Sequence, residues 1–148
     1  MKLTGTYRIP GVRERVFSAL TDPAILCRCI DGCEELTRVG EQTYEARIRL
    51  GIGVLKGVYT GRAELRDLRP PETLALRIDG KGAGGFVSGE ATMRLLEVEG
   101  ETDVVCEGQG QVGGVIAAVG SRLMEPAAKQ LLNRFFRALA GEVGAAPR

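Results

Sequence analysis

The stretch that decides the fold is residues 86–112, FVSGEATMRLLEVEGETDVVCEGQGQV, together with the segment from Gly114 to Glu142 that follows it. In residues 86–98 small and apolar side chains alternate with polar ones, the pattern of a strand that buries one face. Gly100-Glu101 is a turn signal, and residues 102–112 alternate in the same way. From Gly114 to Glu142 apolar residues recur at steps of three and four, which is the spacing of one helix face. The sequence therefore predicts two paired strands with a long helix packed on them.

The chain before this stretch carries further strand signals and two short helices. Residues 3–9 alternate as a strand, and residues 12–20 have helical spacing. Thr21-Asp22-Pro23 is an N-cap with proline in the first turn of a second helix over residues 24–29. Further strands are expected at residues 35–39, 43–50, 54–66 and 74–78, with glycine or proline turns at residues 40–41, 51–53, 70–71 and 80–85.

The predicted order is one strand, two short helices, six strands and a long helix. Strands that follow one another by hairpins form an antiparallel sheet, and the last helix covers its concave face. This is an α+β arrangement. We expect a single domain over residues 1–148, with a frayed tail at residues 144–148.

The composition is that of a folded domain with balanced charge. The chain has 148 residues, with 20 Lys plus Arg and 19 Asp plus Glu, for a formal net charge of +1. A nucleic-acid-binding domain normally carries a basic excess, so this class is not expected. No apolar run approaches the ~18 residues of a membrane-spanning helix, and residues 1–5 lack the features of a secretory signal. These observations predict a cytoplasmic protein with free cysteine thiols.

The absence of histidine restricts the chemistry that the chain can perform. Without imidazole, Ser-His-Asp triads and His-ligated metal sites are excluded. Cys27, Cys29, Cys33 and Cys106 do not form the two closely spaced pairs of a structural zinc site, which leaves free thiols or a local disulfide. A nucleophilic cysteine would also lack a histidine as its base. We therefore expect neither catalytic residues nor a metal site.

Glycine accounts for 21 of the 148 residues, and many glycines fall on the predicted inner face of the sheet. The small residues assigned to that face are Gly57, Gly61, Ala63, Gly89, Ala91, Gly108 and Gly110. Glycine inside a strand marks a bend, a bulge or the close approach of another group. Two interpretations stay open at this point. Either the glycines let the sheet curve around its helix with a filled core, or they leave an apolar hollow for a ligand.

The start of the long helix is expected to be weak. Gly113, Gly114 and Gly120 fall in its first two turns, where each costs ~1 kcal/mol relative to alanine. Pro126 removes a backbone hydrogen bond further along. A segment that hinges to admit an apolar guest would have this pattern. The alternative is that residues 121–125 are a break between two packed helices.

Two blocks of sequence resemble one known family. Residues 21–26, TDPAIL, running into residues 29–34, CIDGCE, resemble the D-P-x-x-L-x-x-C-I-P-G-C-E signature of the CoxG family, named for the G subunit of carbon monoxide dehydrogenase. Residues 112–123, VGGVIAAVGSRL, followed by residues 133–136, NRFF, resemble the family's closing pattern. Asp31 stands where the family usually has proline, and Phe17 where tryptophan is common. Longer members carry a C-terminal apolar anchor that is not part of these 148 residues, so permanent anchoring is left open here.

The resemblance implies a START-like (SRPBCC) helix-grip fold, in which a curved, seven-stranded antiparallel sheet grips a long C-terminal helix around an apolar cavity. It further implies a non-enzymatic accessory protein of a molybdenum-containing carbon monoxide dehydrogenase or a related hydroxylase. The implied cavity guest is an apolar lipid, a menaquinone- or ubiquinone-like quinone. The implied location is the cytoplasm, with peripheral contact to the inner face of the membrane and assistance in recruiting the enzyme or passing electrons to quinone.

Alternation along the strands and the implied cavity together predict the site. The candidate ligand-binding residues are Ile48, Tyr59, Gly61, Val87, Met93, Ile116, Val119, Leu123 and Leu131, with Cys29, Ile30 and Gly32 near an entrance. Burial of an isoprenoid tail at ~25 cal/mol per Å² would supply most of the affinity. A few polar groups would orient the headgroup.

Two other functional interpretations stay open. The first is a START-like cyclase or hydrolase acting on a hydrophobic or aromatic substrate, with Tyr44, Tyr59 or Glu90 as its acid or base. The second is a docking factor with a filled core that uses arginines on the outer face of the sheet. These arginines are Arg47, Arg49, Arg62, Arg66 and Arg69.

Overall fold

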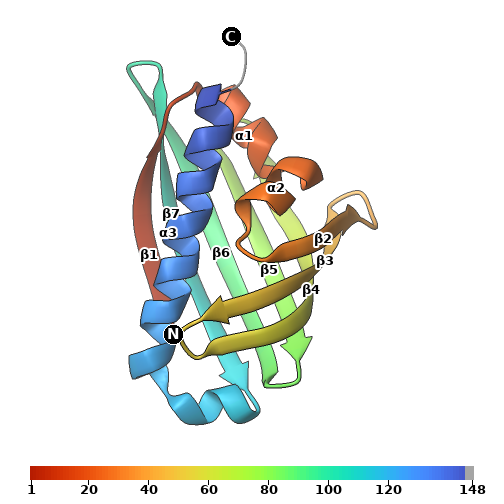
Figure 1. Ribbon diagram of the computed structural model, residues 1–148. Helices are drawn as coiled ribbons and strands as arrows, with labels where there is room; N and C mark the ends of the chain where they lie inside the picture. Colours follow the sequence, from red (N-terminus) through yellow and green to blue (C-terminus); the bar gives the residue numbers. More distant parts are fainter. Residues whose placement is uncertain (146–148) are drawn as a thin grey trace.

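The computed structural model describes residues 1–145, in which one curved sheet wraps around a long helix (Figure 1). In chain order the elements are β1 (Lys2–Ile9), α1 (Arg13–Leu20), α2 (Pro23–Cys29), β2 (Cys33–Arg38), β3 (Thr43–Ile52), β4 (Leu55–Arg69), β5 (Thr73–Gly82), β6 (Gly85–Val98), β7 (Glu101–Gly113), the short 3₁₀ helix η1 (Val115–Val119) and α3 (Ser121–Ala145). Within residues 1–145 the seven strands form one antiparallel sheet in the order β1-β7-β6-β5-β4-β3-β2. The predicted α+β, helix-grip fold is confirmed.

The hairpin turns are tighter than the sequence signals indicate. Between β6 and β7, Glu99 and Gly100 have φ angles of 52° and 82°. Two successive residues with positive φ are typical of the hairpin turn that matches the twist of its strands. Between β5 and β6, Gly82 pairs with Gly85, so the turn holds two residues. The glycine-rich segment 80–85, expected to be a flexible turn, therefore lies mostly within the strands.

The inner face of the sheet is the one that alternation predicts. Tyr44, Leu65, Met93 and Val104 are all buried on it, and their sequence neighbours point outward. Gly57 is the exception among the glycines assigned to this face, because it is exposed and has a φ of 105°. Glycine is therefore needed at position 57 for this positive φ, at the end of the sheet.

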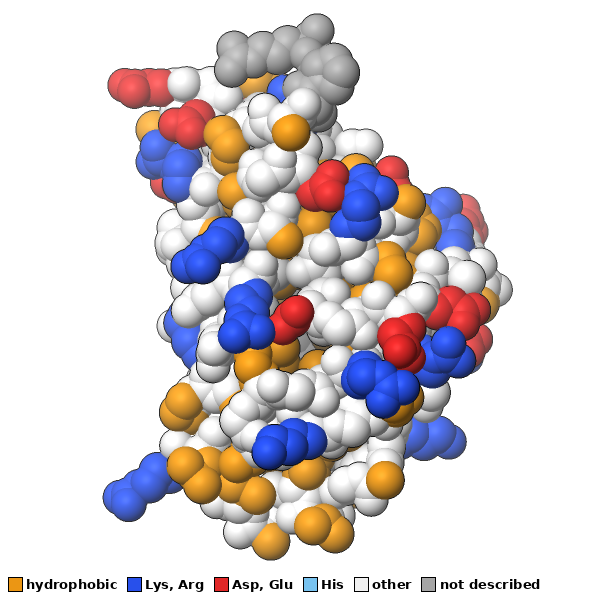
Figure 2. Space-filling view, viewed as in Figure 1, with side chains coloured by type: hydrophobic (Ala, Val, Ile, Leu, Met, Phe, Trp, Pro, Cys, Tyr) orange, Lys and Arg blue, Asp and Glu red, His pale blue; other side chains and the backbone are white. Residues whose placement is uncertain are grey.

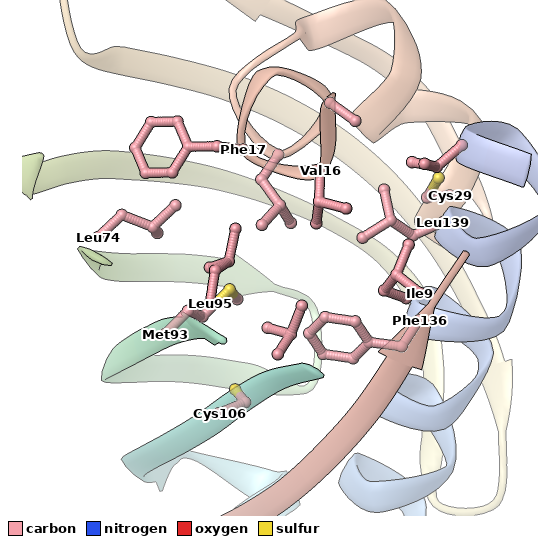
Figure 3. Close-up of a cluster of buried hydrophobic side chains, with 14 of the residues drawn as sticks. Ile9, Val16, Phe17, Cys29, Leu74, Met93, Leu95, Cys106, Phe136 and Leu139 are labelled. Atoms are coloured by element: carbon pink, nitrogen blue, oxygen red, sulfur yellow. The ribbon is translucent and has the colours of Figure 1, made fainter. Parts of the chain in front are cut away.

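The core fills one end of the molecule more completely than the other. Figure 3 shows the larger cluster, in which Phe17, Leu95, Phe136 and Leu139 are buried between α1, the sheet and the C-terminal half of α3. The ring of Phe136 stacks on that of Tyr7, with centroids 4.2 Å apart. A second, smaller cluster lies under the N-terminal half of α3. It consists of Ile52, Leu55, Tyr59, Ile116, Met124 and Ala127.

The predicted long helix is in fact two helices. Gly120 has a φ of 83° and separates η1 from α3, so the break lies before residues 121–125. Pro126 is inside α3, which continues to Ala145. Residues 144 and 145 of the expected frayed tail are therefore helical, and residues 146–148 lie outside the described part of the chain. No helix in residues 1–145 is both long and apolar enough to cross a membrane.

The loop between α2 and β2 is held beside α3. Asp22 caps α2, since its carboxylate accepts hydrogen bonds from the amides of Ala24 and Ile25 at 2.9 and 3.4 Å. Gly32 has a φ of 79°, and a Cβ there would collide with the backbone carbonyl oxygen of Arg49. Only glycine meets both requirements, so the loop lies closely against β3 at Gly32.

Candidate functional site

An apolar pocket of about 270 Å³ lies between the inner face of the sheet and the N-terminal half of α3. Among its lining residues, only three have a polar group in the side chain, namely Asp31, Tyr59 and Thr60. The full lining is Met1, Ile30, Asp31, Ile48, Leu50, Leu55, Tyr59, Thr60, Gly61, Ile78, Gly80, Val87, Val112, Met124, Ala128, Leu131 and Phe135. A mostly apolar lining with few polar groups is typical of sites for apolar ligands.

Small residues on paired strands create the space. Gly61 of β4 lies opposite Gly80 of β5, and neither has a side chain to fill the hollow. Ile78 belongs to the inner face of β5, yet it is 43% exposed because it borders the hollow. A filled core would bury such a residue. Of the two interpretations of the inner glycines, the structure therefore supports the apolar hollow.

A second apolar hollow of about 180 Å³ adjoins the pocket. Met1 and Ile78 border both, and the second hollow continues over Gly89, Gly108 and Gly110. The N-terminal ammonium group of Met1 donates a hydrogen bond to the carbonyl oxygen of Gly110 at 3.1 Å, which holds the residue in place. The hollow space is therefore elongated across the sheet, with Met1 between its two parts.

Tyr59 contributes a buried polar atom without a partner. The residue is 6% exposed, and in residues 1–145 its hydroxyl oxygen has no hydrogen-bond partner. A Cβ on Gly84 would lie 3.1 Å from this oxygen and 3.1 Å from Cγ2 of Ile116. The hydroxyl thus lies at the η1 end of the site. Buried hydroxyls are nearly always hydrogen-bonded, and an exception calls for an explanation.

The side of the pocket that carries the exposed Asp31 lies between α3 and the α2–β2 loop. Ile30 and Asp31 line it from the loop, and Phe135 lines it from α3. Nη1 of Arg134 donates a hydrogen bond to Oδ2 of Asp31 at 2.7 Å, with both side chains about half exposed. We call this side of the pocket the pocket mouth, defined by Ile30, Asp31, Arg134 and Phe135.

About half of the predicted site residues line the pocket. Ile48, Tyr59, Gly61, Val87 and Leu131 do so, as does Ile30 from the predicted entrance. The lining residues that the prediction missed include Met124, Ala128 and Phe135. These residues lie three, four or seven positions from Leu131, on the same face of the helix, so helical spacing could have identified them. Met1 could not be found in this way, because only the folded chain brings the N-terminus under α3.

Four of the predicted ligand-binding residues are not in the lining. Met93 packs in the larger core cluster (Figure 3). Ile116 is buried in the smaller cluster, while Val119 ends η1. Leu123 is 55% exposed. The prediction for the last three assumes one continuous helix face, and the break at Gly120 changes the direction in which that face points.

Two of the predicted entrance residues also lie elsewhere. Cys29 is buried in the core, with 2% exposure, because α2 packs it against α3 (Figure 3). Burial raises the pKa of its thiol to about 11. Gly32 is exposed and serves the backbone turn that carries Ile30 and Asp31. Of the three predicted entrance residues, Ile30 thus lines the pocket, while Cys29 and Gly32 lie outside its lining.

The residues suspected for catalysis do not gather at the pocket. The hydroxyl of Tyr44 donates a hydrogen bond to the carbonyl oxygen of Thr21 at 2.8 Å. Glu90 lies on the outer face of the sheet, where it accepts a hydrogen bond from Arg77 at 3.2 Å. Of the three suspects, Tyr59 alone lines the pocket.

The outer face of the sheet carries mixed charge. Arg47 and Arg49 both bind Glu34, and Arg66 binds Glu64. Depressions of about 490, 450 and 420 Å³ lie on this face, and charged or polar residues account for much of their lining. They resemble the solvated surface of a sheet more than a site for an apolar ligand.

Exposed apolar side chains gather at the η1 end of the molecule. Val115, Leu123 and Phe86 are 75%, 55% and 52% exposed. Phe86 pairs with Gly113 at the end of β7, which places its ring beside the start of η1. Figure 2 shows hydrophobic side chains at this end, with Lys and Arg side chains around them. We call Phe86, Val115 and Leu123 the apolar end.

The fold recurs in solved structures. A conserved protein from Geobacillus kaustophilus has a TM-score of 0.93 and 34% sequence identity, covering 97% of this chain and 95% of that chain. A protein from Chromobacterium violaceum has a TM-score of 0.76 at 14% identity, covering 98% and 99%. The Zhui aromatase/cyclase from a Streptomyces species has a TM-score of 0.71 at 15% identity, covering 97% and 93%. The last two show the START-like fold alone.

Comparison with protein families gives a direct assignment. No curated protein is significantly similar to the chain. The family model for CoxG, described as the G subunit of carbon monoxide dehydrogenase, matches residues 5–144, which is nearly the whole sequence. The match agrees with the two blocks of sequence that resemble this family. The chain therefore belongs to the carbon monoxide dehydrogenase CoxG family.

Proposed function

We propose that this chain is a non-enzymatic accessory protein that binds an apolar, quinone-like lipid under α3. Its partner in this proposal is a molybdenum-containing carbon monoxide dehydrogenase or a related hydroxylase, for which the protein assists membrane recruitment or electron transfer to quinone. The apolar pocket is the observation that carries the proposal. Membership in the CoxG family supports the choice of partner.

The shape and chemistry of the pocket suit a small ring system with a flexible tail. Its volume of about 270 Å³ is near the lower end of ligand pockets, ~300–1,000 Å³. The adjoining hollow past Met1 and Ile78 would extend the space for a tail. Each 100 Å² of apolar surface buried there contributes about 2.5 kcal/mol. The ring would make few polar contacts, and a ring oxygen near the Tyr59 hydroxyl would provide its missing partner.

Peripheral contact with a membrane is the second element of the proposal. The apolar end would enter the lipid headgroup region, and the exposed Lys56, Lys81 and Arg122 would bind anionic lipids around it. Lys81 pairs with Phe86 across β5 and β6, so one of these charges is next to the apolar end. Basic residues near an anionic surface contribute about 1 kcal/mol each, and shallow apolar insertion adds to this.

Solvent extraction and mass spectrometry of the purified protein test the ligand directly. We expect a co-purifying quinone or other isoprenoid lipid. Because the chain has no tryptophan, Phe135→Trp would place a single tryptophan at the pocket mouth, and a bound quinone would quench its fluorescence. Leu96→Trp, at an exposed site outside the pocket lining, is the matched control. An empty extract together with equal quenching of both variants would rule the proposal out.

A further inference from the structure

Two cysteines meet beside the pocket mouth. Sγ of Cys27, on α2, lies 3.0 Å from Sγ of Cys33, at the start of β2, in a thiol–thiol hydrogen bond. Both residues are half-buried and free, whereas Cys29 and Cys106 are buried in the core. Closing a disulfide requires an S–S distance of about 2.05 Å. The two sulfurs therefore need to approach by only about 1 Å.

The segment between these cysteines is the loop that forms one side of the pocket mouth. It carries Ile30 and Asp31. The carbonyl oxygen of Gly32 accepts a hydrogen bond from the amide of Arg49 at 2.8 Å, which ties the far end of the loop to β3. The near end is the last turn of α2. A covalent bond from Cys27 to Cys33 would join these two ends and limit the movement of the loop.

We propose that Cys27 and Cys33 are an oxidation site that forms an intramolecular disulfide with a low-molecular-weight disulfide as oxidant, and that this bond slows ligand exchange through the pocket mouth. The second half of this proposal rests on the proposed function of the pocket, and the first half does not.

The exchange reaction proceeds in two steps. The Cys27 thiolate attacks the small disulfide and expels one small thiolate, leaving a mixed disulfide on Cys27. The Cys33 thiolate then attacks Sγ of Cys27 and expels the second small thiolate. Two protein thiols are thus oxidised, one small disulfide is reduced to two thiols, and the two protein protons end on the leaving groups. Burial and the neighbouring Cys27 raise the pKa of Cys33 to about 12, so Cys33 is the weaker first attacker.

Mass spectrometry tests the disulfide without any ligand. The full chain is incubated with oxidised glutathione, quenched with acid, denatured, alkylated and digested. We expect a Cys27–Cys33 cross-link, with Cys29 and Cys106 alkylated. Cys27→Ser and Cys33→Ser should each abolish the cross-link, while Cys106→Ala, the matched control, should retain it. Any of three results would overturn the assignment: a stable glutathione adduct on Cys27, a disulfide between Cys29 and either Cys27 or Cys33, or alkylation of all four cysteines.

Stopped-flow release of a fluorescent polyene fatty acid tests the effect on the pocket. We expect release from the oxidised chain to be at least threefold slower than from the reduced chain, and the Cys27→Ser variant to show no redox effect. Equal rates with a verified cross-link would overturn the gating half. If the reduced chain does not bind the fatty acid, both the proposed slowing of ligand exchange and the proposed class of ligand are overturned. The mass spectrometry of the Cys27–Cys33 cross-link still decides whether the disulfide forms.

Discussion

The guanidinium of Arg134 on α3 donates a hydrogen bond to the carboxylate of Asp31 on the α2–β2 loop, Nη1 to Oδ2 at 2.7 Å. This ion pair spans the pocket mouth, because Asp31 lines the pocket and Arg134 precedes Phe135, which lines it from the other side. A second ion pair, Arg28 with Glu142 at 2.7 Å, joins α2 to α3 without reaching the pocket. The two pairs therefore allow the role of the mouth to be separated from the packing of the helices.

Breaking the pair at the mouth should speed ligand exchange. For Asp31→Asn we expect release of a fluorescent fatty acid to be up to about fivefold faster, since exposed ion pairs are worth ~0.2–1 kcal/mol. Stopped-flow measurement at low and high salt checks this, and the difference from wild type should shrink at high salt. Glu142→Gln is the control and should leave the release rate unchanged. A rate increase of the same size in both variants would contradict the prediction.

Removing the Tyr59 hydroxyl should have opposite effects with and without ligand. For Tyr59→Phe we expect a Tm of the ligand-free protein that is equal or higher, since the buried hydroxyl has no partner among the described residues. Affinity for a quinone should fall about 2- to 12-fold, the worth of one hydrogen bond, while affinity for a pure hydrocarbon stays the same.

Tyr44→Phe is the matched control for that variant. It breaks the hydrogen bond to the carbonyl oxygen of Thr21, so it should cost about 0.5–1.5 kcal/mol of stability. Quinone affinity should not change, because Tyr44 lies outside the pocket lining. Calorimetric titration and thermal melts of both variants decide the matter. A loss of quinone affinity confined to Tyr44→Phe would refute the assignment of the Tyr59 hydroxyl.

Filling the pocket should abolish binding without unfolding the protein. A Cβ on Gly61 would lie 3.4 Å from the carbonyl oxygen of Asp79 and 3.8 Å from Cα of Gly80, both ordinary contacts. Gly61→Val therefore suits the strand and projects into the pocket. We expect at least a tenfold loss of ligand affinity with no drop in Tm. Gly51→Val, where a Cβ would meet nothing within 4 Å, should bind normally.

Charging the apolar end should prevent binding to membranes. Val115→Asp combined with Leu123→Asp should lower binding to phosphatidylglycerol vesicles at least tenfold in co-sedimentation. Both side chains are exposed, so stability should change by less than about 0.5 kcal/mol per site. Val39→Asp, at an exposed valine in the β2–β3 turn, is the control. Unchanged sedimentation of the double variant would eliminate this end as the contact.

Stability should decline on acidification. A hydrogen bond from Arg28 lowers the pKa of Glu142, and one from Arg8 lowers the pKa of Asp103. A carboxylate whose folded-state pKa lies below its unfolded value, about 4, stabilises the fold above that value and ceases to do so as the pH falls through the folded pKa. Thermal melts should therefore give a flat Tm above about pH 5 and a decline below about pH 4.

Glu142→Gln combined with Asp103→Asn checks the origin of that decline. The double variant should lose part of the decline, and the part lost should be small because these carboxylates are partly exposed and screened by salt. A Tm that rises between pH 5 and pH 3 would contradict the sign of both pKa shifts.

The fold was readable from local patterns, since each pattern reflects one element. Alternation in β4 and β6 placed Tyr59 and Val87 on the inner face, and the cap at Asp22 placed the start of α2. The period of side chains along a strand is two whatever the strand packs on, so the face follows from the residues themselves. Leu123 lies outside the pocket lining because this logic stops at Gly120, where a positive φ changes the direction of the chain that follows.

Taken alone, the amino-acid order determined the class of fold, the strands and their inward faces, the small residues at Gly61 and Gly89, and the resemblance to CoxG. The tertiary structure alone decided that these small residues leave a hollow, that Met1 lies between its two parts, and that Cys27 meets Cys33 beside the mouth. Periodicity is a property of a few successive residues. Empty volume, by contrast, is the space enclosed by segments far apart in the sequence minus the volume of the side chains that enter it.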